Sequence, residues 1–326
     1  MSNQCTIVMY HYVRELCETR YPGIKGLTVS LFREQLAYMQ RFYKFITVSD
    51  LLSACHDGKE LPRNAALLSF DDGYSDHYLN AFPILDATGI QGVFFPPVCA
   101  VRDGRVLDVN KIHFVLESVK APEQLLEEIF SELDRLRAEG HEIAPNHELY
   151  EKLAVQSEFD LPEIIFTKRL LQRELRQELR AEIVDKLFRL HVTENERAFA
   201  RELYISEEQL RMMVRYGMVI GSHGYEHRWM NTLSPVEQRK EVEESLGFLD
   251  DIGVSKEHWL MCYPYGAHDE SLREICNELG CGAAFTTEVE IAHLDSKNSL
   301  NIPRLDTNHL PKNRTAEPNS WTQLVI

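Results

Sequence analysis

The sequence predicts an α/β fold built on parallel strands, as a barrel or a doubly wound sheet. Two observations indicate this class. Short β-rich runs alternate with amphipathic helical segments about seven times along the chain. The polar motifs come directly after strands, as they do where active sites lie at the carboxyl ends of parallel strands. With 326 residues, the chain is long enough for one large domain or for a domain with an insertion.

The expected strands are apolar runs bounded by turn residues, and the expected helices begin or end at residues that favour those positions. In chain order, the expected strands are residues 5–10, 65–68, 90–95, 218–222, 259–263, 282–285 and 300–302. The helices between them are capped or closed by Ser30, Gly89, Ser206, Ser234 and Asp269, and a further short helix begins at about Asp50. The alternation therefore covers both ends of the chain and leaves a gap in the middle.

Residues 101–204 fill that gap with charged, leucine-rich sequence that contains few strand formers. Pro122 suits a first helical turn that continues to Gly140. A longer helix is expected after Pro162, with apolar residues four apart at Leu171, Leu175, Leu179, Ile183 and Leu187. We interpret this segment as a mostly helical insertion.

The domain organisation follows from this insertion. Residues 1–100 and 205–310 are expected to form one discontinuous α/β domain, and residues 311–326 a polar, poorly ordered tail. The leucine stripe of the insertion packs within its own domain, or serves as a subunit contact that forms a homo-oligomer or as a substrate lid.

Composition excludes several classes of protein. The formal net charge of -16 argues against nucleic acid as a partner, because such binding needs clustered Lys and Arg.

The N-terminus lacks a basic flank and its apolar run is too short for a signal peptide, so we expect a cytoplasmic protein. No apolar run is long enough for a transmembrane segment. The seven cysteines are expected to be reduced thiols.

Two adjacent carboxylates, Asp71 and Asp72, stand at the end of the strand expected at residues 65–68. They belong to the motif S-F-D-D-G, whose final Gly73 marks the turn out of the strand. At the carboxyl end of a parallel strand, one acid can hold a cation while the other accepts a proton. The alternative is an Asp-Gly turn without chemistry.

Two histidines, His223 and His227, follow the strand expected at residues 218–222. Imidazoles four apart meet on one face of a helical turn, where both can reach one metal ion at about 2.0–2.1 Å. Two histidines and one carboxylate form a facial set that leaves positions open for water and substrate. Gly224 and the position of Glu226 argue against a zincin helix. The alternative is a pair of surface or hydrogen-bonded histidines.

A third polar segment, Tyr263-Pro264-Tyr265-Gly266, also follows an expected strand. Its proline and glycine favour a tight turn, which can direct a backbone N–H towards a developing oxyanion. By itself, the segment is only a turn.

These motifs resemble those of the NodB-homology polysaccharide deacetylases, which form carbohydrate esterase family four. The resemblance covers residues 5–100 and 205–310. The T/S-F-D-D-G motif of the family matches residues 69–73, and its H-S/T-x-x-H motif matches residues 223–227, with Gly224 in place of the hydroxyl residue. The resemblance implies a distorted (β/α) barrel of about seven strands, interrupted here by the helical insertion.

The resemblance also implies roles for the matched residues. Asp71 corresponds to the general base of the family. The ligands of a divalent metal, Zn²⁺ or another divalent transition metal, correspond to Asp72, His223 and His227. The missing hydroxyl at Gly224 removes a contact that braces the ligand loop in the family.

Two further positions depart from the family pattern. In the R-x-P-Y motif, Cys262 stands where an arginine is expected to orient the base, although Tyr265 is retained and can supply its backbone N–H. Arg304 is the candidate replacement for that arginine, and a structural salt bridge is the alternative role. The L-x-H motif that supplies the general acid has no clear counterpart. His11 is the best candidate for the acid, ahead of His309 and His293.

The resemblance therefore implies a metal-dependent hydrolase that removes the N-acetyl group from a polysaccharide, a lipid-linked sugar or a nucleotide-linked sugar. The lost arginine and acid support the alternative of a non-catalytic carbohydrate-binding relative. A glycosidase fits less well because the sequence shows no separated pair of acids. A phosphoryl-transfer or receiver-type protein also fits less well, since two imidazoles favour a softer metal than Mg²⁺.

Overall fold

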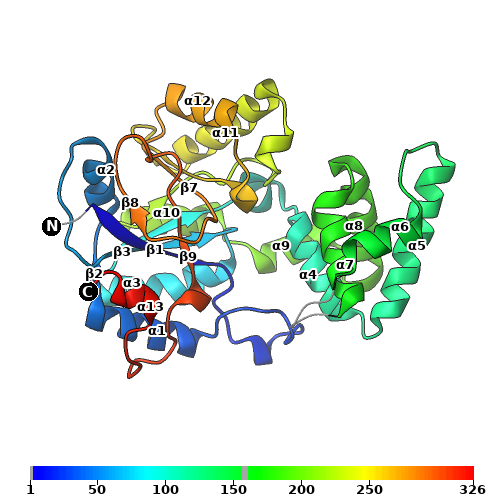
Figure 1. Cartoon of the computed structure of the whole chain (residues 1–326), viewed down its shortest axis with the longest axis horizontal. Helices are drawn as coiled ribbons and strands as arrows, with labels where there is room; N and C mark the ends of the chain where they lie inside the picture. Colours follow the sequence, from blue (N-terminus) through cyan, green and yellow to red (C-terminus); the bar gives the residue numbers. More distant parts are fainter. Residues whose placement is uncertain (1–2, 156–160) are drawn as a thin grey trace. The chain divides into compact units, whose positions relative to one another are not determined.

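The computed structural model describes residues 3–155 and 161–326, shown in Figure 1. The chain divides into two compact units, and we describe each by itself. The first unit comprises the described residues of Met1–Glu15, together with Lys25–Arg105 and Ala200–Ile326. The second comprises Leu16–Ile24 and the described residues of Val106–Phe199.

A mixed β-sheet forms the centre of the first unit. Strands β5, β4, β3, β1 and β8 lie in that order, while β2 pairs with β3 and β9 pairs with β1. Only β8 runs antiparallel to its neighbour in this sheet. The strands of this sheet are β1 (Gln4–Tyr10), β2 (Lys44–Phe45), β3 (Ala65–Asp71), β4 (Gly92–Phe95), β5 (Val219–Ile220), β8 (Ala292–His293) and β9 (Leu305–Asp306).

Two further strands, β6 (Leu260–Cys262) and β7 (Ala283–Phe285), form a separate parallel pair. Isolated bridges join this pair to its surroundings, at Ser222 with Met261 and at Phe285 with Ile302. The predicted α/β class is therefore confirmed, and the strands form an open barrel whose ladder is not continuous.

Helices surround these strands in the first unit (Figure 1). They are α1 (Val29–Phe42), α2 (Val48–His56), α3 (Phe82–Thr88), α10 (Glu207–Arg215), α11 (Pro235–Asp251), α12 (Glu270–Glu278) and α13 (Ser320–Gln323). Short helical turns in this unit are η2 (His77–Ala81), η3 (Cys99–Asp103), η5 (Met230–Thr232), η6 (Pro264–Gly266) and η7 (Thr307–His309). Side-chain caps start several of the helices, as Thr28 does for α1 and Ser206 for α10. The cap of α1 is thus Thr28 and not Ser30, because the Thr28 side chain accepts the N–H of Leu31.

The register of the parallel strands places their carboxyl ends together. Tyr10 at the end of β1 pairs with Phe70, and Asp71 at the end of β3 pairs with Phe95. All seven residues of β3 are buried, as expected for a central strand covered on both faces. The residues that follow these strands therefore emerge at one edge of the sheet.

The second unit is helical. It contains η1 (Leu16–Glu18), α4 (Asp108–Ser118), α5 (Pro122–Ala138), α6 (Asn146–Leu153), α7 (Pro162–Arg169), η4 (Leu170–Glu174) and α8 (Gln177–His191), and α9 (Glu196–Leu203) crosses into the first unit. The long helix expected after Pro162 is wrong in one respect, because Leu175 adopts an extended conformation that separates η4 from α8. Among the described residues, no helix is both long and apolar enough to cross a bilayer.

The C-terminal residues 311–326 are not the poorly ordered tail that their composition indicated. They include α13, and Val325 is 2% exposed. The Thr322 hydroxyl lies 2.8 Å from the Tyr38 hydroxyl and accepts a hydrogen bond of 2.9 Å from Tyr43. A few well-placed contacts thus bury a segment whose overall composition is polar.

Candidate metal centre

Asp72, His223 and His227 come together at the carboxyl edge of the sheet. Asp72 follows β3, and His223 follows β5 after the two residues that extend this strand towards β6. The ligand atoms of the three residues all lie within 4.8 Å of one another, and all three side chains are buried. The two segments that carry them are about 150 residues apart in the chain, so the tertiary fold brings them together.

The distances in this cluster suit a small divalent ion. Oδ1 of Asp72 lies 3.5 Å from Nε2 of His223 and 3.3 Å from Nε2 of His227. Ligand atoms bound at about 2.0–2.1 Å to a tetrahedral ion are separated by about 3.3–3.4 Å. The three groups can therefore hold such an ion with little movement.

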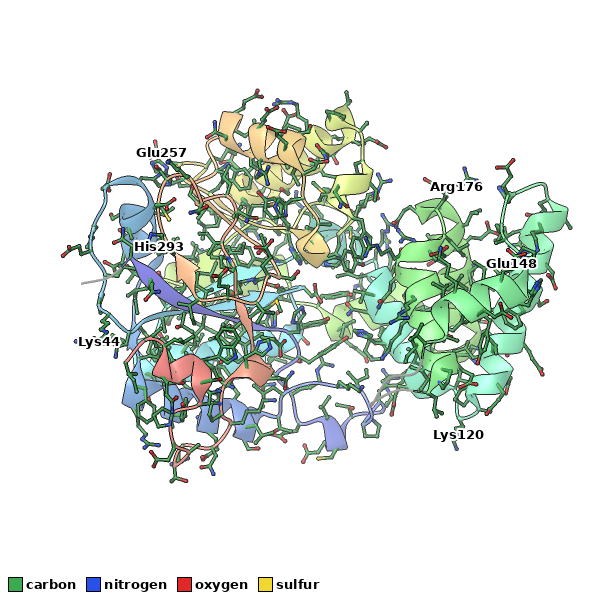
Figure 2. The ribbon with its side chains drawn as sticks, in the orientation of Figure 1. Lys44, Lys120, Glu148, Arg176, Glu257 and His293 are labelled. Atoms are coloured by element: carbon green, nitrogen blue, oxygen red, sulfur yellow. The ribbon has the colours of Figure 1, made fainter. Side chains whose placement is uncertain are left out.

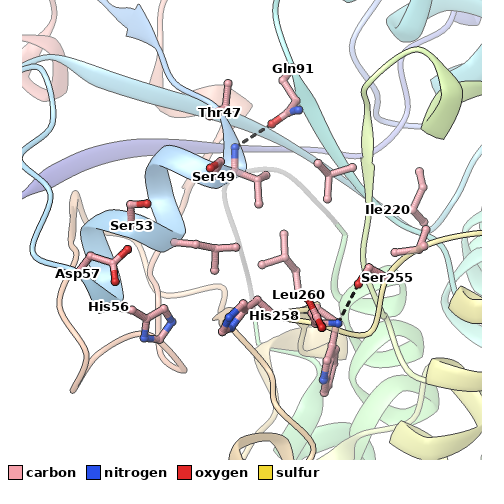
Figure 3. A pocket seen from close by; sticks show the side chains of 16 residues that line it. Thr47, Ser49, Ser53, His56, Asp57, Gln91, Ile220, Ser255, His258 and Leu260 are labelled. Carbon is pink, nitrogen blue, oxygen red and sulfur yellow. Dashed lines mark hydrogen bonds between the residues drawn. The ribbon is translucent and has the colours of Figure 1, made fainter.

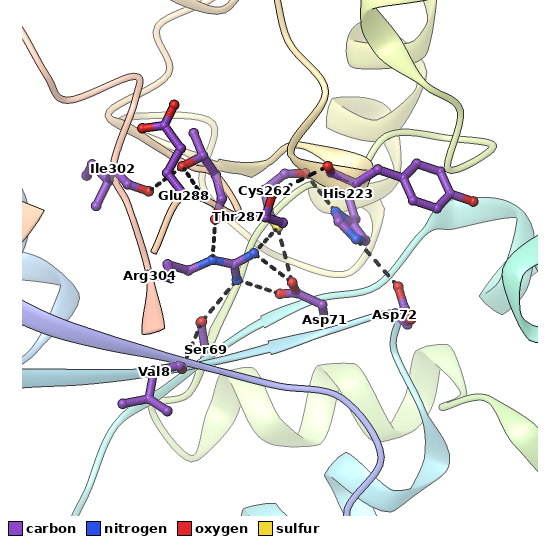
Figure 4. Close-up of polar contacts among 12 residues, drawn as sticks. Val8, Ser69, Asp71, Asp72, His223, Cys262, Thr287, Glu288, Ile302 and Arg304 are labelled. Carbon is purple, nitrogen blue, oxygen red and sulfur yellow. Dashed lines mark hydrogen bonds and ion pairs between the residues drawn. The ribbon is translucent and has the colours of Figure 1, made fainter. Parts of the chain in front are cut away.

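Contacts outside the cluster orient the ligand groups. Nδ1 of His223 lies 2.7 Å from the carbonyl oxygen of Cys262, so this nitrogen donates and Nε2 faces Asp72, as Figure 4 shows. The Tyr74 hydroxyl donates to Oδ2 of Asp72 at 2.7 Å, which leaves Oδ1 directed at the histidines. Such partners set the tautomer and orientation of metal ligands. Tyr74 was missed by the sequence analysis, although it directly follows the S-F-D-D-G motif.

The protonation states of Asp72 and His227 suit cation binding, whereas that of His223 does not. Burial alone would raise the pKa of Asp72, but hydrogen bonds from His223 and His227 hold this pKa well below its usual range. Burial lowers the pKa of His227, which keeps its ring neutral. Burial opposes the charging of His223, yet Cys262 and the hydrogen bond to Asp72 raise its pKa. A metal ion bound here would therefore have to compete with a proton for Nε2 of His223.

Asp71 and Arg304 form a buried, bidentate ion pair, shown in Figure 4. Nη1 of Arg304 donates to Oδ1 at 2.8 Å, and Nη2 donates to Oδ2 at 2.8 Å. Arg304 is 1% exposed, and it also donates to the Ser69 hydroxyl and the Thr286 carbonyl. Burial would raise the pKa of Asp71, but the charge of Arg304 outweighs burial and lowers this pKa to about 2. Asp71 is thus a fixed, ionised carboxylate beside the metal cluster.

Cys262 fills the space beside this ion pair. Its sulfur lies 3.2 Å from Nη2 of Arg304 and 3.5 Å from Oδ2 of Asp71. Cys262, Asp71 and His223 form a second cluster of groups that metals accept as ligands. The Arg304 guanidinium already contacts both Cys262 and Asp71 there, and burial raises the pKa of the thiol. The Asp72 cluster is therefore the better candidate for a cation site.

Tyr265 packs directly on His227, one of the candidate ligands. Its ring lies 4.6 Å from the ring of His227 and is stacked on Trp229 at 4.4 Å, with an angle of 5° between the planes. Trp229 is half-buried, and the sequence analysis did not single it out. Tyr265 thus lies between the rings of His227 and Trp229 and contacts both.

The candidate acids differ in position. His11 directly follows β1, and the β1–β3 register puts it beside Asp71. His293, labelled in Figure 2, pairs with Gln4 at the opposite end of β1, and its side chain is 63% exposed. His309 accepts the N–H of Asp306 on its Nδ1 at 3.0 Å, within the turn after β9. The fold therefore keeps His11 as the candidate that lies nearest the carboxylates.

Backbone strain is concentrated in this region. Among the described residues, four residues other than glycine have positive φ, and three of them are Asp72, His227 and Tyr265. The fourth is His258. Left-handed backbone costs free energy for such residues and persists at sites where the surroundings impose it for function. This observation supports a functional role for the cluster independently of its chemistry.

A separate pocket of about 730 Å³ lies in the first unit, between α2 and the starts of β4 and β6 (Figure 3). His56 and His258 face each other in it, with ring centroids 6.0 Å apart. Nε2 of His56 lies 2.7 Å from the Gly282 carbonyl oxygen, so this ring already has a partner. None of the residues predicted for the site lines this pocket.

Comparison with known proteins finds a family match for part of the chain. Residues 177–284 match the family model for polysaccharide deacetylase. The matched segment contains His223, His227 and Tyr265, whereas Asp71 and Asp72 lie outside it. Over 96 residues, the chain is 32% identical to poly-beta-1,6-N-acetyl-D-glucosamine N-deacetylase of Escherichia coli strain K12. This match covers 29% of the chain and 14% of that protein, so the chain spans only a small part of the relative's length.

The whole fold is similar to those of solved deacetylase structures. Streptococcus pyogenes deacetylase PplD in complex with acetate superposes with a TM-score of 0.58 over 97% of this chain and 99% of that chain, at 18% identity. IcaB from Ammonifex degensii gives a TM-score of 0.54 over 99% and 95%, at 17% identity. These two likenesses concern the fold. The matched segment shows that the chain contains a polysaccharide deacetylase domain, of the NodB-homology class that forms carbohydrate esterase family four.

Proposed function

We propose that the protein is a metal-dependent hydrolase that removes N-acetyl groups from an N-acetylated polysaccharide. The observation that carries this proposal is the joint geometry of the buried Asp72, His223 and His227 cluster and the ion-paired Asp71 beside it. The Escherichia coli relative supports the substrate class, since its name specifies an N-deacetylase of poly-N-acetylglucosamine.

Each group at the site has a role in amide hydrolysis. Asp71 accepts the proton of the attacking water, and Arg304 holds both oxygens of its carboxylate so that it stays ionised and oriented. The backbone N–H of Tyr265 donates to the oxyanion that develops on the acetyl oxygen. Asp72, His223 and His227 would hold a divalent metal. When bound, such a metal lowers the pKa of a water and polarises the amide carbonyl.

Metal dependence is the direct test of this proposal. Treatment with a strong chelator should abolish acetate release from an N-acetylglucosamine oligomer, and added Zn²⁺ or another divalent transition metal should restore it. The Asp72→Asn variant should lose both the metal and the restored activity. Metal content by mass spectrometry and acetate by enzymatic assay provide the two measurements.

The result also separates the two functions that the sequence left open. A non-catalytic carbohydrate-binding relative would bind the oligomer without releasing acetate at any metal loading. Acetate release that survives complete metal removal would contradict the metal-dependent mechanism.

We further propose that His11 is the acid that protonates the leaving amine. His11 directly follows β1, in which Tyr10 pairs with Phe70, so the next position of this register places it beside Asp71. The substitution His11→Gln should lower kcat by about 10²–10³-fold on the sugar substrate. On an activated anilide, whose amine leaves without protonation, the loss should be much smaller.

The matched control for this experiment is His309→Gln, because His309 is bonded within its own turn. Its kcat should remain near that of the wild type. Equal losses in the two variants, or an equal loss on both substrates, would argue against His11 as the acid.

A further inference from the structure

A buried carboxylate on α11 contacts the loop between the two ligand histidines. Glu241 is 5% exposed and lies on the face of α11 (Pro235–Asp251) that packs inwards. Its Oε2 accepts the backbone N–H of Tyr225 at 2.8 Å and that of Glu226 at 2.9 Å. These two amides lie between His223 and His227 in the chain. Glu241 is not part of either cluster of candidate ligands.

The same helix supplies a second contact one turn later. The hydroxyl of Ser245 lies 2.6 Å from the hydroxyl of Ser222, and Ser222 in turn accepts the backbone N–H of Gly224 at 3.2 Å. Residues four apart share one face of a helix, so Glu241 and Ser245 reach the loop together. The backbone N–H groups of residues 225 and 226 therefore donate to Glu241 on α11. The N–H of residue 224 donates to Ser222, whose hydroxyl contacts Ser245 on the same helix.

Gly224 makes room for this arrangement. A Cβ atom at this position would lie 3.3 Å from Oε2 of Glu241, and the residue has a φ of +71°. Both the left-handed backbone and the close approach of the carboxylate favour glycine here. The missing side chain at residue 224 and the carboxylate of Glu241 are thus complementary features of one loop.

We propose that Glu241 is a positioning residue that holds His223 and His227 at the separation that metal binding requires. Its carboxylate fixes the two intervening amides, and Ser245 fixes the start of the loop. The proposal rests on the proposed metal-dependent function, because it assigns Glu241 a role in organising the ligands. Contacts of this kind around metal ligands change metal affinity by about 10–100-fold when they are removed.

The test compares Glu241→Ala and Glu241→Gln with Glu244→Ala in the full chain. Glu244 lies on the same helix, and its side chain is 44% exposed. We expect Glu241→Ala to weaken zinc binding by about 10–100-fold, measured by competition with a chromophoric chelator, and to change the visible spectrum of the Co²⁺-loaded protein. Glu241→Gln should lose less, since its amide oxygen still accepts hydrogen bonds. Glu244→Ala should match the wild type.

Hydrogen exchange of the Tyr225 and Glu226 amides in metal-free protein separates this inference from the proposed function. These amides should exchange at least about tenfold faster in Glu241→Ala, or in Glu241→Gln if the alanine variant does not fold. A wild type that binds no metal would remove the proposed function, and accelerated exchange would still establish Glu241 as the loop anchor. Unchanged zinc affinity and exchange in both Glu241 variants would overturn the inference.

Discussion

The Asp71→Asn variant is expected to lose about 10²–10⁴-fold in kcat for acetate release while it retains its metal. An asparagine side chain cannot accept the proton of the attacking water, whereas the proposed ligands Asp72, His223 and His227 are unchanged. Initial rates on an N-acetylglucosamine oligomer, measured beside metal content after dialysis, test both parts of this expectation. Retained metal would show that the loss concerns proton transfer and not an empty site.

Asp76→Asn is a suitable control for the loss of a buried acid. Asp76 is 5% exposed and pairs with Arg14, with Oδ2 accepting a hydrogen bond of 2.6 Å from Nε. It belongs to neither cluster of candidate ligands. Its replacement should affect stability more than kcat. Full turnover by Asp71→Asn, or a parallel fall in both variants, would require another residue to be the base.

The features that the sequence predicted well depend on local pattern. The strand that precedes Asp71 is a continuous apolar run, and the turn at Gly73 is a glycine with a φ of +64°. Likewise, His223 and His227 follow a strand, and the strand ends meet because parallel pairing aligns them. Local sequence and one rule of topology therefore suffice to bring the carboxylates and the histidines to the same edge.

The features that the sequence did not predict depend on contacts between distant residues. Residues 16–24 belong to the helical unit, but nothing in their composition links them to residues 106–199. Leu175 continues the leucine spacing, yet its backbone is extended, because periodicity reports which residues are apolar and not where a helix breaks. Glu241 could not be predicted from the sequence because it is one of many acids on amphipathic helices. Only the fold shows that it is buried against the loop between His223 and His227.

The role of Arg304 could be predicted only in part from the sequence. The sequence made it a candidate because the position of Cys262 lacks the expected arginine, but it left a structural salt bridge open as the alternative. In the structure, β9 pairs with β1, and Arg304 directly precedes β9. That pairing delivers its guanidinium to Asp71 across 233 positions of the chain. The contact thus supports both a structural and an orienting role, and these can be measured separately.

Replacing Arg304 with methionine is expected to lower the free energy of unfolding by about 3–5 kcal/mol at pH 7. Methionine fills a similar volume but leaves the Asp71 carboxylate buried without its cation. The Ser69 hydroxyl and the Thr286 carbonyl also lose a donor. Urea unfolding followed by circular dichroism measures the effect. Arg314→Met is the control, since its pair with Glu34 is exposed and should contribute little.

The pH dependence of this loss identifies Asp71 as its source. In the wild type, the pKa of Asp71 is lowered to about 2, so its stabilising contribution is present above the unfolded pKa of about 3.9 and is lost as the pH falls towards 2. Without Arg304, burial is expected to raise this pKa above the unfolded value. The folded variant then takes up a proton as the pH falls, and its deficit relative to the wild type shrinks between pH 7 and pH 4. A deficit that stays constant over this range would assign the lost stability to the packing of the side chain and not to the ion pair.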